Sequence, residues 1–303
     1  MQKIAFVFSG QGAQYSGMGK ELYEISDAAK QLFDMATEIR TPTLKQCFYG
    51  TKEELSLTLN TQPCLFCTDL SAALALKENG VTPDFVAGFS LGEIAALAFA
   101  ECLSHNDAFN LVCKRAEFMN DAAQQNKGVM IAVLGLPAVK IKEICNLFDG
   151  AFPVNFNCPT QTAVACSEAL LEALTSELVK HGAKVIKLAV SGAFHSPYMN
   201  IATLKMREFI KQITFTPPKI PVFSNATAQP YSDKSLIAKQ INSPVLWQDT
   251  VENMIALGVD TFIEVGAGKT LCNLIRKINP HVAVYNVEDK NSLKNVLEEL
   301  GKC

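Results

Sequence analysis

The sequence predicts an α/β fold in which a smaller unit is inserted into a larger one. Short β-rich runs alternate with helix-length segments along most of the 303 residues, and this alternation favours a parallel or mixed sheet covered by helices. Within residues 126–190 the order becomes β-α-β-β-α-β, which is the order of a ferredoxin-like unit. The first pattern then returns. We therefore expect a discontinuous large domain, 1–125 and 191–303, and a small domain at 126–190.

Periodicity predicts the individual elements of both domains. In the large domain we expect strands at 3–8, 84–88, 220–225, 261–265 and 282–287. Its helices are expected at about 20–36, 62–79, 91–100, 106–125, 198–213, 249–257 and 271–278, with a short C-terminal helix. In the small domain we expect strands at 128–136, 152–157, 161–166 and 183–190, and helices at 138–148 and 169–182.

Composition excludes several classes of function. Hydrophobic residues make up 49% and charged residues 19% of the chain, and the formal net charge is −3, as in an ordinary globular protein. A nucleic-acid partner would normally require a basic excess. The sequence has no recognisable signal peptide, and no apolar run approaches the roughly 18–20 residues of a membrane span. We expect a cytoplasmic protein with no nucleic-acid or membrane partner.

The cysteines predict buried thiols and no metal site. Ten cysteines are scattered along the chain, and only Cys64 and Cys67 form a C-x-x-C pair. This pair lies in an apolar, helix-patterned stretch without a second pair or a histidine cluster. A reducing compartment explains it better than a metal or redox centre.

The stretch Gly88-Phe89-Ser90-Leu91-Gly92 is a candidate nucleophile site. It matches G-x-S-x-G and lies between a predicted strand and a predicted helix, as a nucleophile elbow requires. The glycines allow strand and helix to approach closely, and the helix start brings N–H groups and a positive dipole end to the serine oxygen. The alternative is a serine that only caps the helix.

A serine nucleophile needs a base, and His195 is the best candidate among four histidines. It follows a predicted strand and precedes a helix that Pro197 helps to start, and sites in α/β sheets gather at such strand ends. The alternative is a surface-loop histidine. No acid between residues 90 and 195 stands out as a third member, so a backbone carbonyl or an amide is expected to orient the imidazole.

Three further features have competing interpretations. The glycine-rich stretch 8–19 offers N–H groups to an anion or a carbonyl oxygen, but it lacks the spacing of a dinucleotide site. The stretch VGAGKTL at 265–271 resembles a P-loop, but Ile263 stands where Walker A needs glycine, which favours a tight turn.

Arg115 lies among apolar residues on a helix. It is either a solvated arginine or a planar clamp for a carboxylate.

Nine motifs resemble those of the malonyl-CoA:acyl carrier protein transacylases, the acyltransferases of fatty acid and polyketide synthesis. In chain order they are FSGQGAQYSGMG, TQP, GFSLGE, KRAEFM, VNFNCPTQ, SGAFHSPYM, VFSNATA, QINSPVLW and EVGAGKTL. The resemblance implies an α/β-hydrolase-like large domain with a ferredoxin-like small domain inserted. It also implies transfer of a malonyl group from malonyl-CoA to the phosphopantetheine thiol of an acyl carrier protein, for fatty acid synthesis, with no bound cofactor.

The resemblance implies a role for each matching residue. Ser90 would carry the malonyl ester, and His195 would act as base and then as acid. The backbone carbonyl of Gln240 would hold the histidine, and the N–H groups of Gln11 and Leu91 would form the oxyanion hole.

The resemblance also implies the residues that recognise the acyl group. Arg115 would pair with the malonyl carboxylate, and Phe194 would fill the space that an α-methyl branch needs. The pocket or the pantetheine channel would be lined by Gln62, Met119 and Asn155. The chain departs from the family's usual pattern at Phe89, where a histidine is usual.

Other readings of the same motifs remain. One is a free-standing, trans-acting malonyltransferase of a polyketide synthase, and another is a serine acyl hydrolase. A third is a silent scaffold that binds carrier protein. Arg115 argues against the hydrolase, and the presence of both Ser90 and His195 argues against the scaffold. We expect a monomer, and candidates for docking the acidic carrier protein are Lys184, Lys187, Lys205, Arg207 and Lys269.

Overall fold

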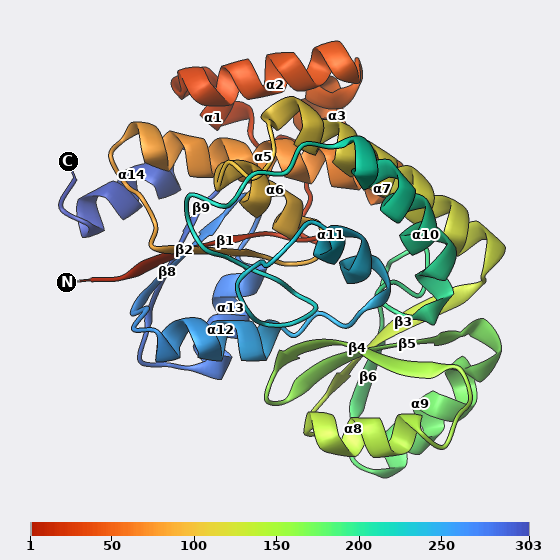
Figure 1. Ribbon diagram of the computed structural model, residues 1–303. Helices are drawn as coiled ribbons and strands as arrows, with labels where there is room; N and C mark the ends of the chain where they lie inside the picture. Colours follow the sequence, from red (N-terminus) through yellow and green to blue (C-terminus); the bar gives the residue numbers. More distant parts are fainter. Residues whose placement is uncertain (1, 303) are drawn as a thin grey trace.

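A five-stranded parallel sheet forms the centre of the larger part of the molecule (Figure 1). The computed structural model describes residues 2–302. The strand order is β7-β2-β1-β8-β9, and every neighbouring pair is parallel. The strands are β1 (Ile4–Phe8), β2 (Phe85–Gly88), β7 (Val222–Phe223), β8 (Thr261–Val265) and β9 (Ala283–Val287). Their carboxyl ends therefore share one edge, where ligand sites of such sheets are found.

Helices cover both faces of this sheet, as the alternation of strand and helix predicts. One face packs against α5 (Thr58–Glu78), α6 (Gly92–Phe99) and α7 (His105–Gln125), and the other against α12 (Trp247–Ala256) and α13 (Thr270–Ile278) (Figure 1). Successive strand residues point to opposite faces. In β1, Phe6 and Phe8 accordingly join the core under α5 to α7, while Ala5 and Val7 join the core under α12 and α13.

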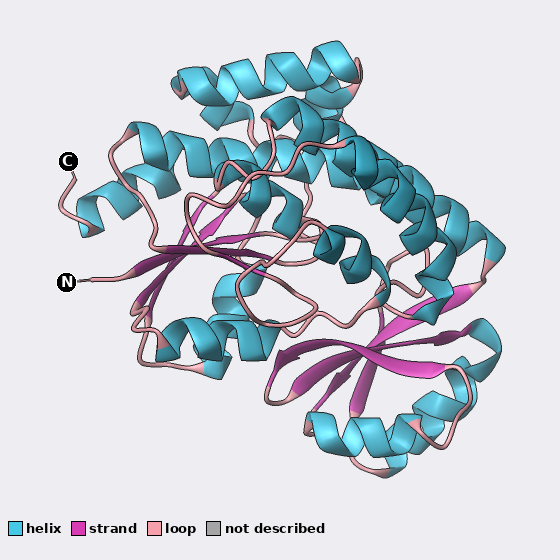
Figure 2. Cartoon of the chain, in the orientation of Figure 1, coloured by secondary structure: helices cyan, strands magenta, loops and turns pink. Residues whose placement is uncertain are grey.

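A separate four-stranded antiparallel sheet lies beside the larger part (Figure 2). Its strands are β3 (Gly128–Leu134), β4 (Ala151–Cys158), β5 (Gln161–Ser167) and β6 (Lys184–Lys187), in the order β4-β5-β3-β6. Together with α8 (Ala138–Cys145) and α9 (Leu171–Lys180) they follow the predicted order β-α-β-β-α-β. Ile131 and Val133 pack under the two helices, so Ala132 points to the opposite face, toward the larger part.

The remaining helices pack around these elements. They are α1 (Lys20–Ile25), α2 (Asp27–Ile39), α3 (Thr43–Tyr49), α4 (Lys52–Ser56), α10 (Asn200–Phe209), α11 (Ser235–Lys239) and α14 (Lys290–Glu299). The single helix predicted at 20–36 is wrong, because Ser26 is extended and its side chain caps α2 by accepting the N–H of Ala29. Within residues 2–302, no helix combines the length and the apolar character of a membrane span.

Short elements account for the other differences from the sequence prediction. Sequence periodicity does not indicate α3, α4 and α11, because helices of five to seven residues complete too few turns to show a helical period. The strand predicted at 220–225 is paired only at Val222 and Phe223, and the strand predicted at 183–190 ends at Lys187. Both leave their sheet early, and the loops that follow them carry Asn225 and His195 to the same edge.

Candidate active site

Ser90 lies on a sharp turn between β2 and α6, as the G-x-S-x-G pattern predicts. Its backbone is left-handed, with φ at +56°, which is uncommon for a residue with a side chain. A Cβ on Gly88 would overlap the backbone of Gly92, and a Cβ on Gly92 would overlap the carbonyl of Ser9. Both flanking positions therefore require glycine because strand, turn and helix are in direct contact.

His195 lies within hydrogen-bond distance of Ser90. Its Nε2 is 2.7 Å from the Ser90 Oγ, and its Nδ1 is 2.9 Å from the backbone carbonyl of Gln240. A carbonyl oxygen only accepts, so Nδ1 carries the proton and Nε2 is free to accept from the serine. This arrangement explains why the sequence offers no acid for a triad.

Burial shapes the acid–base behaviour of His195. The residue is 3% exposed, and burial followed by the charge of Arg115 lowers the pKa of the imidazole to about 4. The hydrogen bond to Gln240 opposes this shift and does not overcome it. The imidazole is therefore neutral at physiological pH, which is the form that accepts a proton.

Arg115 is buried beside the nucleophile without a carboxylate in direct contact. It comes from α7, is 1% exposed, and its Nη2 lies 3.2 Å from the Ser90 Oγ. The guanidinium donates to the side-chain oxygens of Gln62 and Gln240, each at 2.7 Å, and its Nε has no partner among the described residues. Burial lowers the pKa of Arg115 to about 10, so the group remains cationic at neutral pH.

Of the other residues expected at the acyl pocket, some contact Arg115 or its partner and one lies in the core. Gln62, on α5, joins Arg115 directly and also donates to the Met119 sulfur at 3.5 Å. Phe194 is buried in the core, and its ring lies against Gly192. The structure therefore groups Gln62 and Met119 with Arg115.

The residues expected to form an oxyanion hole come from two loops in contact. Leu91 immediately precedes α6, so its N–H belongs to the helix start, where backbone donors lack partners within the helix. Gln11 follows β1, and the neighbouring Gly10 is so close that an added Cβ would lie 2.7 Å from the Phe89 carbonyl. This contact brings the loop of Gln11 to the Ser90 turn.

A cavity of about 190 Å³ opens beside the turn, between the two sheets. Gln11 and Phe89 line it on the side of the parallel sheet, and Asn155 and Asn157 line it on the side of the antiparallel sheet. Both asparagines are buried, and the Oδ1 of each has no hydrogen-bond partner among the described residues. Two residues of the cavity wall thus have an unpaired acceptor, and of these the sequence indicated only Asn155.

Phe89, the residue that departs from the family pattern, is part of the cavity wall. Its ring packs edge-on against Trp247, with ring centroids 5.5 Å apart. The contact extends the apolar core under α12 and α13 to the rim of the site. A hydrophobic neighbour thus supports the turn from the side of the cavity.

Sequence reasoning missed a second group of residues at the turn. The Asn225 side chain binds the backbone on both sides of Phe89, and the Asn225 backbone N–H donates to Glu93. Tyr231 donates to the same carboxylate. Glu93 and Asn225 lie in motifs that carried the resemblance, but their pattern alone did not indicate a role.

Comparisons with known proteins show which family the chain belongs to. The family model for the acyl transferase domain matches residues 5–289. The malonyl CoA-acyl carrier protein transacylase of Bacillus subtilis (strain 168) is 42% identical, over 99% of this chain and 98% of that one. The crystal structure of the malonyl CoA-acyl carrier protein transacylase from Clostridium perfringens superimposes with a TM-score of 0.95 at 34% identity, over 99% and 98% of the two chains. The chain belongs to the malonyl-CoA:acyl carrier protein transacylase family.

A further structural relative of this transacylase family was solved with a partner. It is a malonyl-transacylase in complex with a type II polyketide synthase acyl-carrier protein. This chain superimposes on it with a TM-score of 0.94 at 30% identity, over 98% of this chain and all of that one.

Two motifs that suggested other chemistry have structural explanations in this transacylase fold. The carboxylate of Glu264 accepts the N–H groups of Leu271 and Cys272 at 3.0 and 2.7 Å. The start of α13 is therefore occupied by a side chain of the protein, which explains why VGAGKTL is a turn and not a phosphate loop. Cys64 and Cys67 are buried within α5.

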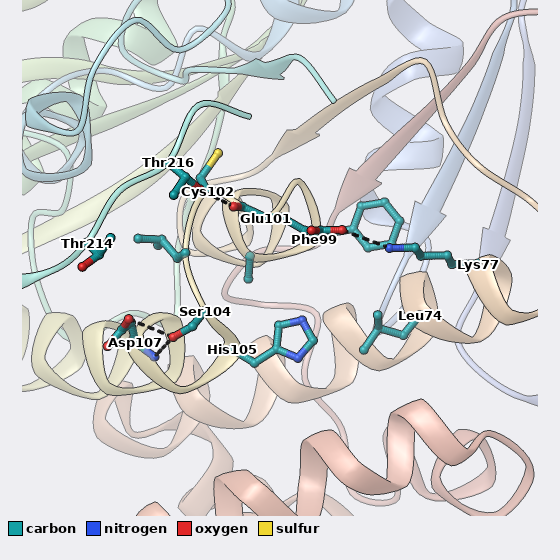
Figure 3. Close-up of a pocket in the computed structure, with 12 residues that line it drawn as sticks. Leu74, Lys77, Phe99, Glu101, Cys102, Ser104, His105, Asp107, Thr214 and Thr216 are labelled. Atoms are coloured by element: carbon teal, nitrogen blue, oxygen red, sulfur yellow. Dashed lines mark hydrogen bonds and ion pairs between the residues drawn. The ribbon is translucent and has the colours of Figure 1, made fainter. Parts of the chain in front are cut away.

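A larger hollow lies away from the site, at the far end of α6 (Figure 3). It measures about 510 Å³, and its charged groups already have partners. Lys77 pairs with Glu101 at 3.4 Å, and the Asp107 carboxylate accepts from Ser104 at 2.8 Å. Size alone therefore does not identify the active site of this family member.

The pH dependence of Ser90 reactivity tests the assignment of His195 as a neutral base. Phenylmethylsulfonyl fluoride reports this reactivity without needing a carboxylate in the reagent. We expect the inactivation rate to fall on the acid side near pH 4, since His195 becomes protonated only there. Arg115→Ala removes the second cause of the shift, so its acid limb should lie closer to the ordinary value of 6.5. An acid limb near 6.5 in the unmodified protein would contradict the assignment.

Substitution of Gly92 tests the close packing of the turn. In Gly92→Ala the methyl group overlaps the Ser9 carbonyl, so we expect a loss of about 1–3 kcal/mol in the free energy of unfolding and slower sulfonylation of Ser90. The matched control is Gly182→Ala, where φ is +90° and the space is open. It should cost about 1–2 kcal/mol and leave Ser90 reactivity unchanged. Urea unfolding and the inactivation rate measure the two effects separately.

Proposed function

We propose that the chain transfers a malonyl group from malonyl-CoA to the phosphopantetheine thiol of an acyl carrier protein, through a malonyl ester on Ser90. The observation that carries the proposal is the contact of Arg115 with the nucleophile, 3.2 Å from the Ser90 Oγ. A serine–histidine pair alone fits any acyl transfer. A buried guanidinium beside it, with only neutral acceptors, selects an acyl group that carries its own carboxylate.

The first half-reaction loads the serine. His195 Nε2 takes the Ser90 hydroxyl proton while the Oγ attacks the thioester carbon of malonyl-CoA, giving a tetrahedral oxyanion. When the carbon–sulfur bond breaks, the imidazolium returns the proton to the departing CoA sulfur. The products are CoA thiol and the malonyl ester of Ser90.

The second half-reaction repeats these steps with the carrier protein. His195 takes the proton of the pantetheine thiol, whose sulfur attacks the ester carbon. The carbon–oxygen bond then breaks, and the Ser90 Oγ recovers the proton from the imidazolium. The Gln240 carbonyl holds the imidazole through Nδ1 at both stages. These steps use only groups of the protein and the two substrates, and we propose no bound cofactor or metal.

Backbone donors stabilise the oxyanion in each half-reaction. We assign this role to the N–H groups of Gln11 and Leu91, since the contact of Gly10 with Phe89 brings their loops together. The positive end of the α6 dipole acts in the same direction. Each such donor typically lowers the barrier by on the order of 3 kcal/mol.

Arg115 determines which acyl group is loaded. The guanidinium matches a carboxylate with two parallel hydrogen bonds, and malonyl binding requires it to exchange one neutral partner, Gln62 or Gln240, for the carboxylate. An acetyl group has no carboxylate that could replace the glutamine contact. We assign Met119 to the pocket wall with Gln62, and Phe194 to the exclusion of an α-methyl branch.

The cavity beside the turn is proposed as the path of the pantetheine arm. This arm carries two amide groups, and their N–H groups are suitable donors for the unpaired Oδ1 atoms of Asn155 and Asn157. Buried acceptors without partners are costly, and a ligand amide would satisfy them. Phe89 would contact the apolar part of the arm.

The acyl carrier protein is proposed to dock at the mouth of this cavity. Lys269 precedes Thr270, which lines the cavity. Lys184 and Ile186 lie on the same face of β6. Ile186 pairs with Ala132, which lines the cavity, so Lys184 points to the side of the sheet where the cavity lies. Lys187 points to the other face of the sheet, where it lines a hollow against α9. Lys184 is therefore a better docking candidate than Lys187, and so is Lys269, whose nearest carboxylate, that of Glu288, is 4.0 Å away.

Lys205, a further candidate from the sequence, is also less suitable for docking. It pairs with Asp121 at 2.9 Å, so its charge is partly neutralised within the chain. Arg207 is exposed on α10, and its part in docking stays a prediction.

The finer description of the fold is also a proposal. The strand order β4-β5-β3-β6 with two helices on one face supports a ferredoxin-like small domain at 126–190. The parallel sheet with Ser90 between β2 and α6 supports an α/β-hydrolase-like large domain formed by 1–125 and 191–303.

The setting of the reaction is proposed from the same features. The nine cysteines within residues 2–302 are free thiols, which supports a cytoplasmic location. We propose a monomer that supplies fatty acid synthesis, with supply of a polyketide synthase in trans as the alternative.

Formation of a malonyl adduct tests the proposed reaction. Mixed with malonyl-CoA, the protein should gain the mass of one malonyl group, and Ser90→Ala should gain none. Carrier protein with its pantetheine arm should remove the adduct. An adduct that disappears equally fast without carrier protein would instead indicate the serine hydrolase.

Substitution of Arg115 tests the selection of the acyl group. Arg115→Ala should lose about 10- to 100-fold in the rate of malonyl loading, since a charge-assisted pair contributes about 1.5–3 kcal/mol, and acetyl-CoA should become a comparable substrate. The exposed Arg276→Ala is the matched control and should load as the unmodified protein does. Unchanged preference for malonyl in Arg115→Ala would overturn the role of the guanidinium. Intact mass after rapid quenching gives both rates.

A further inference from the structure

Glu93 is a buried carboxylate that the reaction does not use. It lies on α6 one turn after Ser90 and has no exposed surface. One oxygen accepts the Tyr231 hydroxyl at 2.5 Å, and the other accepts the backbone N–H of Asn225 at 2.5 Å. The carboxylate thus joins the nucleophile helix to the segment that follows β7.

Asn225 uses both ends of its side-chain amide on the nucleophile turn. Its Nδ2 donates to the Gly88 carbonyl at 2.6 Å, and its Oδ1 accepts the Ser90 N–H at 2.7 Å. The two contacts lie on either side of Phe89, so the amide spans the turn from the strand side to the serine. The short pairing of β2 with β7, Ala87 opposite Phe223, brings these strand ends side by side.

These contacts act on the part of the backbone that is under strain. Ser90 is held at a φ of +56°, and such a conformation persists only where its surroundings impose it. The hydrogen bond to Asn225 also occupies the Ser90 N–H. Donation to an oxyanion is then left to the next N–H along the chain, that of Leu91.

We propose that Asn225 is a positioning residue for the nucleophile, and that Glu93 holds Asn225 in place. Asn225 keeps the Ser90 Oγ directed at the His195 Nε2 and keeps the Leu91 N–H free for the oxyanion. The inference rests on the proposed function, in which Ser90 carries the acyl group.

The choice of residues supports positioning over simple packing. Burying a carboxylate without an ion pair costs much more than burying an apolar side chain of similar size. Burial accordingly raises the pKa of Glu93 to about 7, although its hydrogen bonds to Tyr231 and Asn225 act in the opposite direction. A strong acceptor at this position is useful because it binds the backbone N–H of Asn225 and leaves the side-chain amide of Asn225 free to bind the turn.

Substitution at Asn225 gives the direct test. Asn225→Ala removes both contacts with the turn, and we expect malonyl loading to slow by about 10- to 100-fold. The KM for malonyl-CoA should change by less than about twofold, because Arg115 and the cavity are untouched. Sulfonylation of Ser90 by phenylmethylsulfonyl fluoride should slow by a similar factor. Asn225→Asp has the same size and keeps the acceptor for the Ser90 N–H, but its second oxygen faces the Gly88 carbonyl. It should also slow loading and sulfonylation, and it provides a measurable variant if the alanine does not fold.

A pair of substitutions at Glu93 tests the proposal that Glu93 holds Asn225 in place. Glu93→Gln can accept from Asn225 and donate to the Tyr231 oxygen, so it should load at close to the unmodified rate. Glu93→Ala cannot, and it should resemble Asn225→Ala in both loading and sulfonylation. Near-ultraviolet circular dichroism confirms that each variant compared is folded.

The outcomes separate this inference from the proposed function. If the unmodified protein forms no malonyl adduct, the proposed function fails. If the adduct forms and Asn225→Ala loads and sulfonylates at the unmodified rate, the positioning role is wrong. Equal rates for Glu93→Gln and Glu93→Ala would overturn the role of Glu93 alone.

Discussion

The buried cation of Arg115 is the constraint around which the active site is arranged. The guanidinium lies against Ser90 and is held by the side chains of Gln62 and Gln240. A cation without an anion in contact is unfavourable in a dry interior, and an arriving carboxylate relieves that cost. The same charge helps to keep His195 neutral. In the proposed reaction, one side chain therefore selects the substrate and keeps the base unprotonated.

Gln240 connects these two functions physically. Its carbonyl fixes the tautomer of His195, while its side chain accepts from Arg115 and donates to the Ser90 carbonyl. A backbone carbonyl can replace the acid of a triad because it orients the imidazole without adding a negative charge. In the proposed reaction, such a charge beside Arg115 would compete with the malonyl carboxylate.

The sequence predicts the parts of the site that local patterns encode. The alternation of strands and helices is confirmed, and the glycines around Ser90 indicate the turn because only glycine tolerates the contacts found there. The predicted helix at 20–36 is wrong, since a capping serine divides it. Asn225 could not be predicted, because it lies 135 residues from Ser90 and the contact depends on two sheet residues pairing. Interactions of this kind follow from tertiary structure and have no local signal.

The most direct measurement is a crystal structure of the malonyl-enzyme, formed with malonyl-CoA in the absence of carrier protein. The account predicts an ester on the Ser90 Oγ whose free carboxylate forms two hydrogen bonds with Arg115, with Gln62 or Gln240 displaced from the guanidinium. It also predicts that the ester carbonyl oxygen faces the N–H groups of Gln11 and Leu91. A malonyl ester whose carboxylate points away from an Arg115 still bound to both glutamines would contradict the central claim.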